Sequence, residues 1–148
     1  MKRRTCIGYI FLSLFVGLTA ISASAQTGGR LTADVPFDFQ VGSRALSAGE
    51  YTIRQLSSSN DGLLLLLSKG DKQSSMASTR VVEATRTSRR SRMVFNKYGE
   101  RYFLASIWDS RGEGRILPQS AGERNARRET ASIKNAAPEI VVVELALR

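Results

Sequence analysis

The chain has 148 residues, a length suited to a single domain, and its 22 basic and 13 acidic side chains give a formal net charge of +9. It has no histidine and one cysteine, Cys6. The composition therefore argues against disulfide-stapled domains, zinc enzymes and hydrolases that use a histidine base or a cysteine nucleophile.

The first 25 residues have the pattern of a Sec-type export signal. Lys2, Arg3 and Arg4 form a positive start, residues 6–21 carry no charge, and Ala23 and Ala25 form an A-x-A cleavage site. The apolar stretch of 16 residues falls short of the ~20 that span a bilayer comfortably. We therefore expect cleavage after Ala25, with an uncleaved membrane anchor as the less favoured alternative.

Processing would leave residues 26–148 as a single β-rich domain with no transmembrane segment. This part has 19 basic and 13 acidic side chains, a net charge of +6, and no cysteine. Because no disulfide can form, an ordinary hydrophobic core must stabilise it. Sec export places the protein in the periplasm or outside the cell.

Alternating apolar residues and turn signals predict roughly seven strands. Residues 31–41 alternate with period two, which is typical of a strand with one buried face. Pro36 cannot donate to a ladder, so this strand is expected at an edge, or with position 36 facing outward. The other expected strands are residues 51–54, 63–67, 76–85, 92–97, 101–108 and 139–147, separated by turns that contain Gly42, Gly49, Gly62, Gly70 and Gly99.

Two of these segments carry more detailed expectations. Residues 63–67 are five leucines in a row, which favours a central strand covered on both faces, with Leu65 buried. In the strand at 101–108 the expected faces are Phe103, Ala105 and Ile107 on one side, and Tyr102, Leu104 and Trp108 on the other.

One helix is expected near residues 120–132. Ser120 and Glu123 fit a capping box, and Glu123 and Arg127 are spaced to form an ion pair. The apolar stripe is thin, so the helix should lie on the surface. The predicted fold is mainly all-β, an antiparallel sandwich or small barrel with this helix before the last strand.

The motifs of an enzyme are missing. No lysine after residue 25 has a serine three positions before it, and Gly112-Glu113-Gly114 indicates a turn rather than a phosphate-binding loop. Asp34 and Asp38 share a strand face, but ~13 Å of strand separates them, whereas glycosidase carboxylates need ~5–9.5 Å. We expect no catalytic residue, metal or cofactor. The alternative is a periplasmic hydrolase whose carboxylates meet only in the fold.

A cluster of basic residues gives the candidate binding site. Arginine suits bidentate contact with phosphate or carboxylate, and nearby Tyr98, Tyr102 and Trp108 would add stacking surface. The expected ligand is an anionic envelope polymer, a lipid head group or nucleic acid, although no specific nucleic-acid motif is present. The alternative is a solvated hairpin whose charges prevent aggregation. The candidate anion-binding residues are Arg86, Arg89, Arg90 and Arg92, with Lys97 and Arg101 just beyond.

Several motifs together resemble an uncharacterised family of small exported bacterial proteins of acidobacterial type. They are residues 35–42 (VPFDFQVG), 46–51 (LSAGEY), 95–104 (FNKYGERYFL), 107–108 (IW), 115–118 (RILP) and 123–124 (ER). The family usually has proline where Ser47 stands. The resemblance implies a secreted β-rich domain and transfers no activity or site. We therefore expect a non-catalytic exported β domain with a binding or structural role in the cell envelope.

Overall fold

The computed structural model describes residues 31–56, 61–70, 72–84, 90–134 and 137–147. The expected signal peptide, with Ala23 and Ala25, lies outside these residues. They form eleven strands and one helix, α1 (Ala121–Lys134). The strands are β1 (Leu31–Val35), β2 (Phe39–Val41), β3 (Arg44–Leu46), β4 (Gly49–Gln55), β5 (Asp61–Ser68), β6 (Ser74–Glu83), β7 (Arg92–Tyr98), β8 (Arg101–Trp108), β9 (Glu113–Ile116), β10 (Glu139–Glu144) and β11 (Ala146–Leu147).

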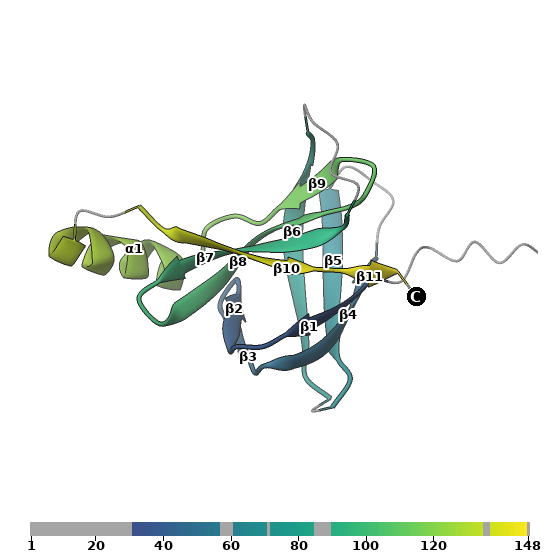
Figure 1. Cartoon of the computed structure of the whole chain (residues 1–148), viewed down its shortest axis with the longest axis horizontal. Helices are drawn as coiled ribbons and strands as arrows, with labels where there is room; N and C mark the ends of the chain where they lie inside the picture. Colours follow the sequence, from purple (N-terminus) through teal and green to yellow (C-terminus); the bar gives the residue numbers. More distant parts are fainter. Residues whose placement is uncertain (1–30, 57–60, 71, 85–89, 135–136, 148) are drawn as a thin grey trace, which may run out of the picture.

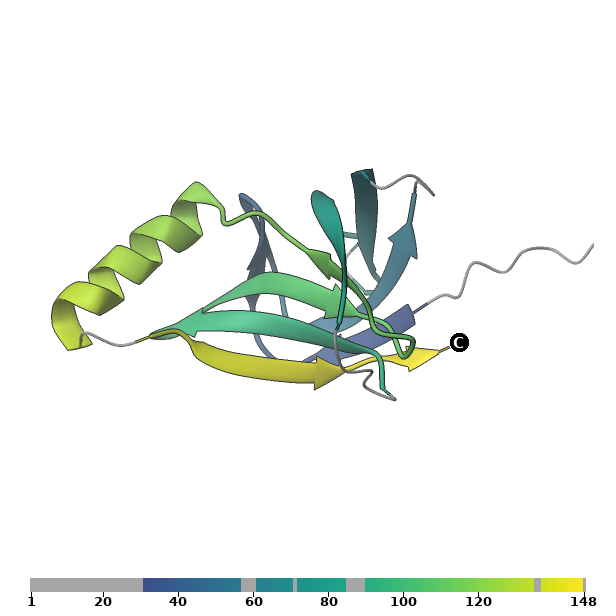
Figure 2. The same ribbon diagram turned by 90° about the horizontal axis from the view of Figure 1, so that it is seen from above.

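All eleven strands of the described chain belong to one mixed sheet, in the order β10-β7-β8-β9-β6-β5-β4-β1-β11, with the β2–β3 hairpin beside β8. The pairings are antiparallel except for β2 with β8. The sheet is not closed into a ring. Its end strands, β10 and β11, are successive in the chain and separated only by Leu145. The C-terminal segment therefore pairs with both ends of a curved sheet (Figures 1 and 2).

The mainly β fold with one short helix before the last strand is confirmed, although the strand count differs. The first expected strand is interrupted at residues 36–38. Pro36 therefore lies outside the strand ladders, where its lack of an N–H donor costs no ladder hydrogen bond. The last is interrupted at Leu145. The short strands β3 and β9 are additional. The period-two pattern of residues 31–41 is confirmed by its buried members, Ala33, Val35, Phe39 and Val41.

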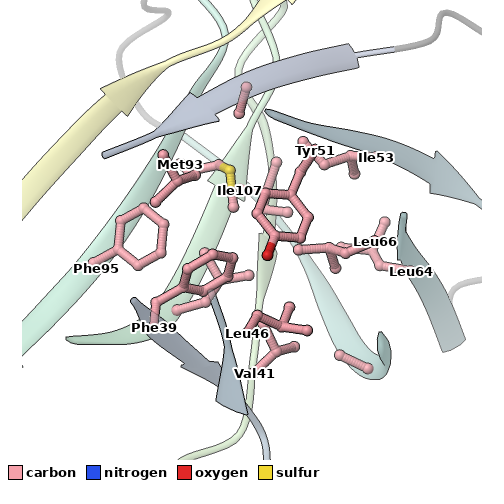
Figure 3. Packing of buried hydrophobic residues seen from close by; sticks show 14 of the residues in the cluster. Phe39, Val41, Leu46, Tyr51, Ile53, Leu64, Leu66, Met93, Phe95 and Ile107 are labelled. Atoms are coloured by element: carbon pink, nitrogen blue, oxygen red, sulfur yellow. The ribbon is translucent and has the colours of Figure 1, made fainter. Parts of the chain in front are cut away.

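The core lies on the inner face of the sheet and combines side chains from eight strands, β1 to β8 (Figure 3). Phe39 packs edge-to-face against Tyr51 and Phe95, with ring centroids 5.1 and 5.4 Å apart. The Tyr51 hydroxyl donates to the carbonyl of Ser47 at 2.5 Å. This buried tyrosine therefore keeps its polar end hydrogen-bonded while its ring fills the core.

The prediction for the leucine run is wrong in one respect. β5 is an interior strand, paired with β4 and β6, but it is not covered equally on both faces. Leu64 and Leu66 are buried, at 3% and 0% exposure, whereas Leu65 is only half-buried. Its neighbour on β6, Met76, is 59% exposed. An uninterrupted apolar run conceals the period-two alternation that would reveal its inward face.

The expected faces of β8 are also wrong beyond its middle. Val94 pairs with Ser106 but Phe95 pairs with Leu104, so Ala105 is an extra residue in a β-bulge. Leu104 and Ile107 consequently both enter the main core. Phe103 instead forms a second cluster with Tyr98 of β7 and Ala126 of α1.

The helix α1 projects beyond the β7–β8 turn (Figures 1 and 2). Ser120 caps it as expected, because its hydroxyl accepts the Glu123 amide at 3.1 Å. The expected ion pair between Glu123 and Arg127 is wrong. The Glu123 side chain is buried and accepts a 2.8 Å hydrogen bond from the Asn96 side chain of β7, so it joins the helix to the sheet.

Candidate binding groove beside β6

The first part of the predicted arginine cluster lies at the start of β7. Arg86 and Arg89 fall outside the described residues. Arg90 is exposed and donates to both carboxylate oxygens of Glu144, at 2.8 and 3.0 Å. That hydrogen bond, followed by the charge of Glu144, raises the pKa of Arg90. The Arg92 guanidinium lies 5.7 Å from the centroid of the Trp108 ring, within cation–π range.

The second part, Lys97 and Arg101, lies at the opposite end of the β7–β8 hairpin. The Lys97 ammonium is 3.2 Å from the Glu139 carboxylate, and Arg101 pairs with Glu129 of α1. The hydrogen bond to Glu139 raises the pKa of Lys97. Five residues of strand, ~17 Å, separate Arg92 from Lys97. The structure therefore does not gather the described members of the predicted anion site, and each has an internal partner.

The aromatic residues predicted to assist that site serve different parts of the fold. Tyr98 is buried beneath α1, and its burial and the nearby Glu123 carboxylate raise its pKa. Tyr102 stacks on Phe37 with ring centroids 4.0 Å apart. Trp108 covers Gly114, where a Cβ would lie 2.5 Å from the indole. Gly114 itself lies in β9, whereas the sequence indicated a turn at this position.

Among the described residues, the fold brings two pairs of carboxylate residues together. Glu83 of β6 lies opposite Glu113 of β9, and Glu113 accepts a hydrogen bond from Arg115 at 2.8 Å. Asp34 of β1 lies directly opposite Glu50 of β4. Glu50 is bound by Lys69 at 2.8 Å, and Asp34 is exposed. The other aspartate considered from the sequence, Asp38, accepts the Ala48 amide at 2.8 Å. Within the described residues there is no cluster of three or more side chains suited to hold a metal ion.

Part of one edge of β6 has no neighbouring strand among the described residues, because β9 covers only one end of β6. β9 pairs with only the last four residues of β6, 80–83. The next residue after β9, Leu117, donates its amide to the carbonyl of Ala105 in the β8 bulge, at 2.9 Å. This hydrogen bond continues the antiparallel ladder between β8 and β9, so the chain stays beside β8 after β9 ends. Residues 74–79 of β6 are left with a strand partner on the β5 side only.

Three clefts follow this unpaired edge of β6. The central one, about 370 Å³, lies between β6 and the β2–β3 hairpin and is lined by residues 41–44, 75–78 and 117–118. A cleft of about 380 Å³ is lined by residues 44–46 and 72–74. Another of about 220 Å³ is lined by residues 78–80 and 116–118. Together they form what we refer to as the β6 groove.

Two contacts show which backbone groups of β6 face the groove. The Ala84 amide donates to Gly112 on the β9 side, at 2.9 Å, and the carbonyl of Ser74 accepts from Arg44 of β3, at 2.6 Å. In a regular strand, alternate residues direct their amide and carbonyl to the same edge. The amides and carbonyls of Met76 and Ser78 therefore point into the groove, where the described residues provide no backbone partner.

The groove is positively charged. Arg44, Lys72 and Arg80 line it, together with serine and apolar side chains, and none of the described residues that line it is acidic. An arginine such as Arg44 offers several donors in a planar fork. The groove can thus supply strand-type hydrogen bonds and electrostatic attraction to an anion.

No protein-family model, curated protein sequence or solved structure matches this chain. Among the described residues, no helix has the length and apolarity that a membrane crossing would require.

Reasoning from the sequence missed the β6 groove. Its walls come from β3, β6 and the segment after β9, which are distant in sequence, and β3 and β9 are too short and polar to predict as strands. The one local signal is the serine-rich start of β6, where Ser74, Ser75 and Ser78 leave little side-chain bulk beside the backbone.

Proposed function

We propose that the protein is a non-catalytic exported β domain that binds an anionic partner in the cell envelope through the β6 groove. The observation that carries this proposal is a free strand edge beside a groove whose described lining residues include three cations and no carboxylate. Clustered charge of one sign in a concave surface attracts ligands of the opposite sign. The expected signal at residues 1–25 supports the compartment.

The groove is a better contact surface than the predicted arginine cluster. Arg90 and Arg92 are engaged by Glu144 and Trp108. Lys97 and Arg101 lie at the far end of the hairpin. In this proposal the arginines at 86–92 add to the positive field around the domain, and the groove makes the specific contacts.

The hydrolase alternative has less support. A catalytic carboxyl pair needs a cleft in which the two groups have different protonation states. The Asp34–Glu50 pair instead lies on the outer face of β1 and β4, beside Lys69. The Asp109 carboxylate lies in the turn before β9. Burial, the largest influence, raises its pKa, but hydrogen bonds from Arg111 and two backbone amides outweigh burial and lower it. That direction is the opposite of what a general acid needs.

The proposal is tested by photo-crosslinking in intact cells that produce the full chain. A benzophenone amino acid replaces Ser78 in the groove or, as a control, Asn125, which is exposed on α1. We expect an envelope-fraction adduct from position 78 that is absent from position 125 and is reduced when Arg44 and Lys72 are both changed to glutamine. Equal adducts at the two positions, or none at position 78, would contradict the proposal.

A further inference from the structure

We propose that the ligand of the β6 groove is an extended acidic polypeptide segment that adds to β6 as a further strand. This inference rests on the proposed function, because it names the ligand of the same groove.

The unpaired edge of β6 has the length and pattern of a strand-addition site. Six residues, 74–79, have no strand partner on the groove side, which corresponds to ~20 Å of strand. Met76 and Ser78 each present an amide and a carbonyl there. A guest that continued the line of β9, antiparallel to β6, would occupy the ladder position that β9 leaves at Leu117. Main-chain hydrogen bonds of this kind provide affinity in complexes formed by strand addition.

The two sides of the groove favour a guest with alternating side chains. Val41, Ala77 and Leu117 lie on its inner side and are buried. Outward on β6 lie Met76, which is 59% exposed, and Arg80, which is also exposed. Because successive side chains of a strand point to opposite faces, a guest would place apolar residues inward and acidic residues outward.

The charges favour an acidic guest over a second copy of this chain. Arg44 and Lys72 lie at one end of the groove and Arg80 at the other. The copy's own free edge would bring the same cations against their counterparts, which is unfavourable. Without a guest, cations along an unpaired edge serve to prevent aggregation. This simpler role makes a different prediction in the experiment below.

The experiment measures the fluorescence anisotropy of labelled eight-residue peptides that are mixed with the purified processed protein, residues 26–148. The probes are an alternating Val-Glu peptide, its Val-Lys counterpart, and two Val-Glu peptides N-methylated at either the odd or the even residues. We expect the Val-Glu peptide to bind and the Val-Lys peptide not to bind. One of the two N-methylated peptides should bind at least about tenfold more weakly, because it loses the hydrogen bonds to β6.

Variants of the protein locate the contact. Met76→Pro removes an amide that points into the groove and leaves the β5 ladder intact, since proline is tolerated on an unpaired edge. Ser78→Ala retains the backbone amide. We expect Met76→Pro to bind the Val-Glu peptide about tenfold more weakly and Ser78→Ala to bind it almost as well as the unchanged protein. Arg44→Gln should also lose affinity for this peptide, whereas the matched control Arg54→Gln should not. Arg54 is exposed on β4, outside the groove.

The result that overturns strand addition is equal affinity for the unmodified and both N-methylated peptides, or no preference for Val-Glu over Val-Lys. The N-methylated peptides make this outcome independent of how well Met76→Pro folds. If position 78 still forms a specific adduct in cells, the proposed function survives and the peptide inference alone fails. If that adduct is also missing, both fail, and the cations of the groove only protect its edge.

Discussion

The Arg115 guanidinium occupies the space that any side chain at position 62 would need. A Cβ at Gly62 would lie 2.0 Å from Nη1 of Arg115 and 2.7 Å from the hydroxyl of Thr79. Nη2 of Arg115 donates to Glu113 at 2.8 Å, and the Thr79 hydroxyl donates to the Gly62 carbonyl at 2.7 Å. A glycine in β5 thus allows a buried arginine from β9 to lie against the strand.

Gly62→Ala is therefore expected to destabilise the protein by about 1–3 kcal/mol through overpacking. Glycine-to-alanine changes inside a strand otherwise tend to stabilise. Urea unfolding of the single and double variants measures the effect. The cost should shrink when Arg115 is already alanine, because the two positions compete for one volume. Additive costs would contradict this account.

The two faces of β5 predict different costs for neighbouring leucines. Leu66 is fully buried, so Leu66→Ala should cost about 2–5 kcal/mol. Leu65 is half-buried, so Leu65→Ala should cost about 1 kcal/mol. The comparison requires denaturant curves of both variants under identical conditions. A larger loss at Leu65 would mean that the register of β5 is shifted by one residue.

The turn before β9 should make the protein sensitive to acid. Asp109 accepts the amides of Arg111 and Glu113, at 2.9 and 2.8 Å, and its pKa is lowered overall. Its contribution to stability is therefore present above about pH 4 and is lost as the pH falls further. Asp109→Asn should unfold at a lower temperature at pH 7 and lose less stability between pH 4 and pH 2. Parallel melting curves of the two proteins would contradict this.

The arginines between β6 and β7, which are not neighbours in the sheet, should contribute salt-dependent attraction without specific recognition. Changing Arg86, Arg89, Arg90 and Arg92 to serine should weaken binding to anionic lipid vesicles and lipopolysaccharide, mainly at low salt, because exposed charges are screened beyond ~8 Å at physiological ionic strength. Binding of the Val-Glu peptide should be unchanged. The control removes the same charge elsewhere, from Arg54, Arg124, Arg127 and Arg128. Equal vesicle binding by the two variants would eliminate these four arginines as a site.

Processing after Ala25 predicts a defined amino terminus. The intact mass of the exported protein should correspond to a chain that begins with Gln26 or its cyclised form. Cell fractionation followed by mass spectrometry checks this directly. Recovery of only full-length chain in the membrane fraction would contradict the export signal.

The period-two pattern allowed the strands to be predicted where it was uninterrupted. Residues 31–41 alternate clearly, and the odd positions Ala33, Val35, Phe39 and Val41 are buried as expected. The leucine run has no alternation to follow, so its inward face could not be identified. The bulge at Ala105 lies where Leu117, from the segment after β9, donates to the Ala105 carbonyl. Local sequence carries no signal for such a contact.

The candidate site was less predictable than the fold because its partners are distant in sequence. Arg90 pairs with Glu144, Lys97 with Glu139 and Arg101 with Glu129. A count of nearby arginines does not reveal these acids, and so overstates the free positive charge. The β6 groove, in turn, arises from a missing strand pairing, which composition does not indicate.

The pairing of the C-terminal segment has a consequence for how the chain acquires its structure. β11 lies against β1, although more than a hundred residues separate Leu31 from its partner Leu147. Until residues 139–147 have been synthesised, β1 lacks its β11 neighbour and β7 lacks its β10 neighbour. Closing such a long connection is entropically costly and slows folding. A nascent chain would thus stay incompletely folded until residues 139–147 have emerged and can pair with both β1 and β7.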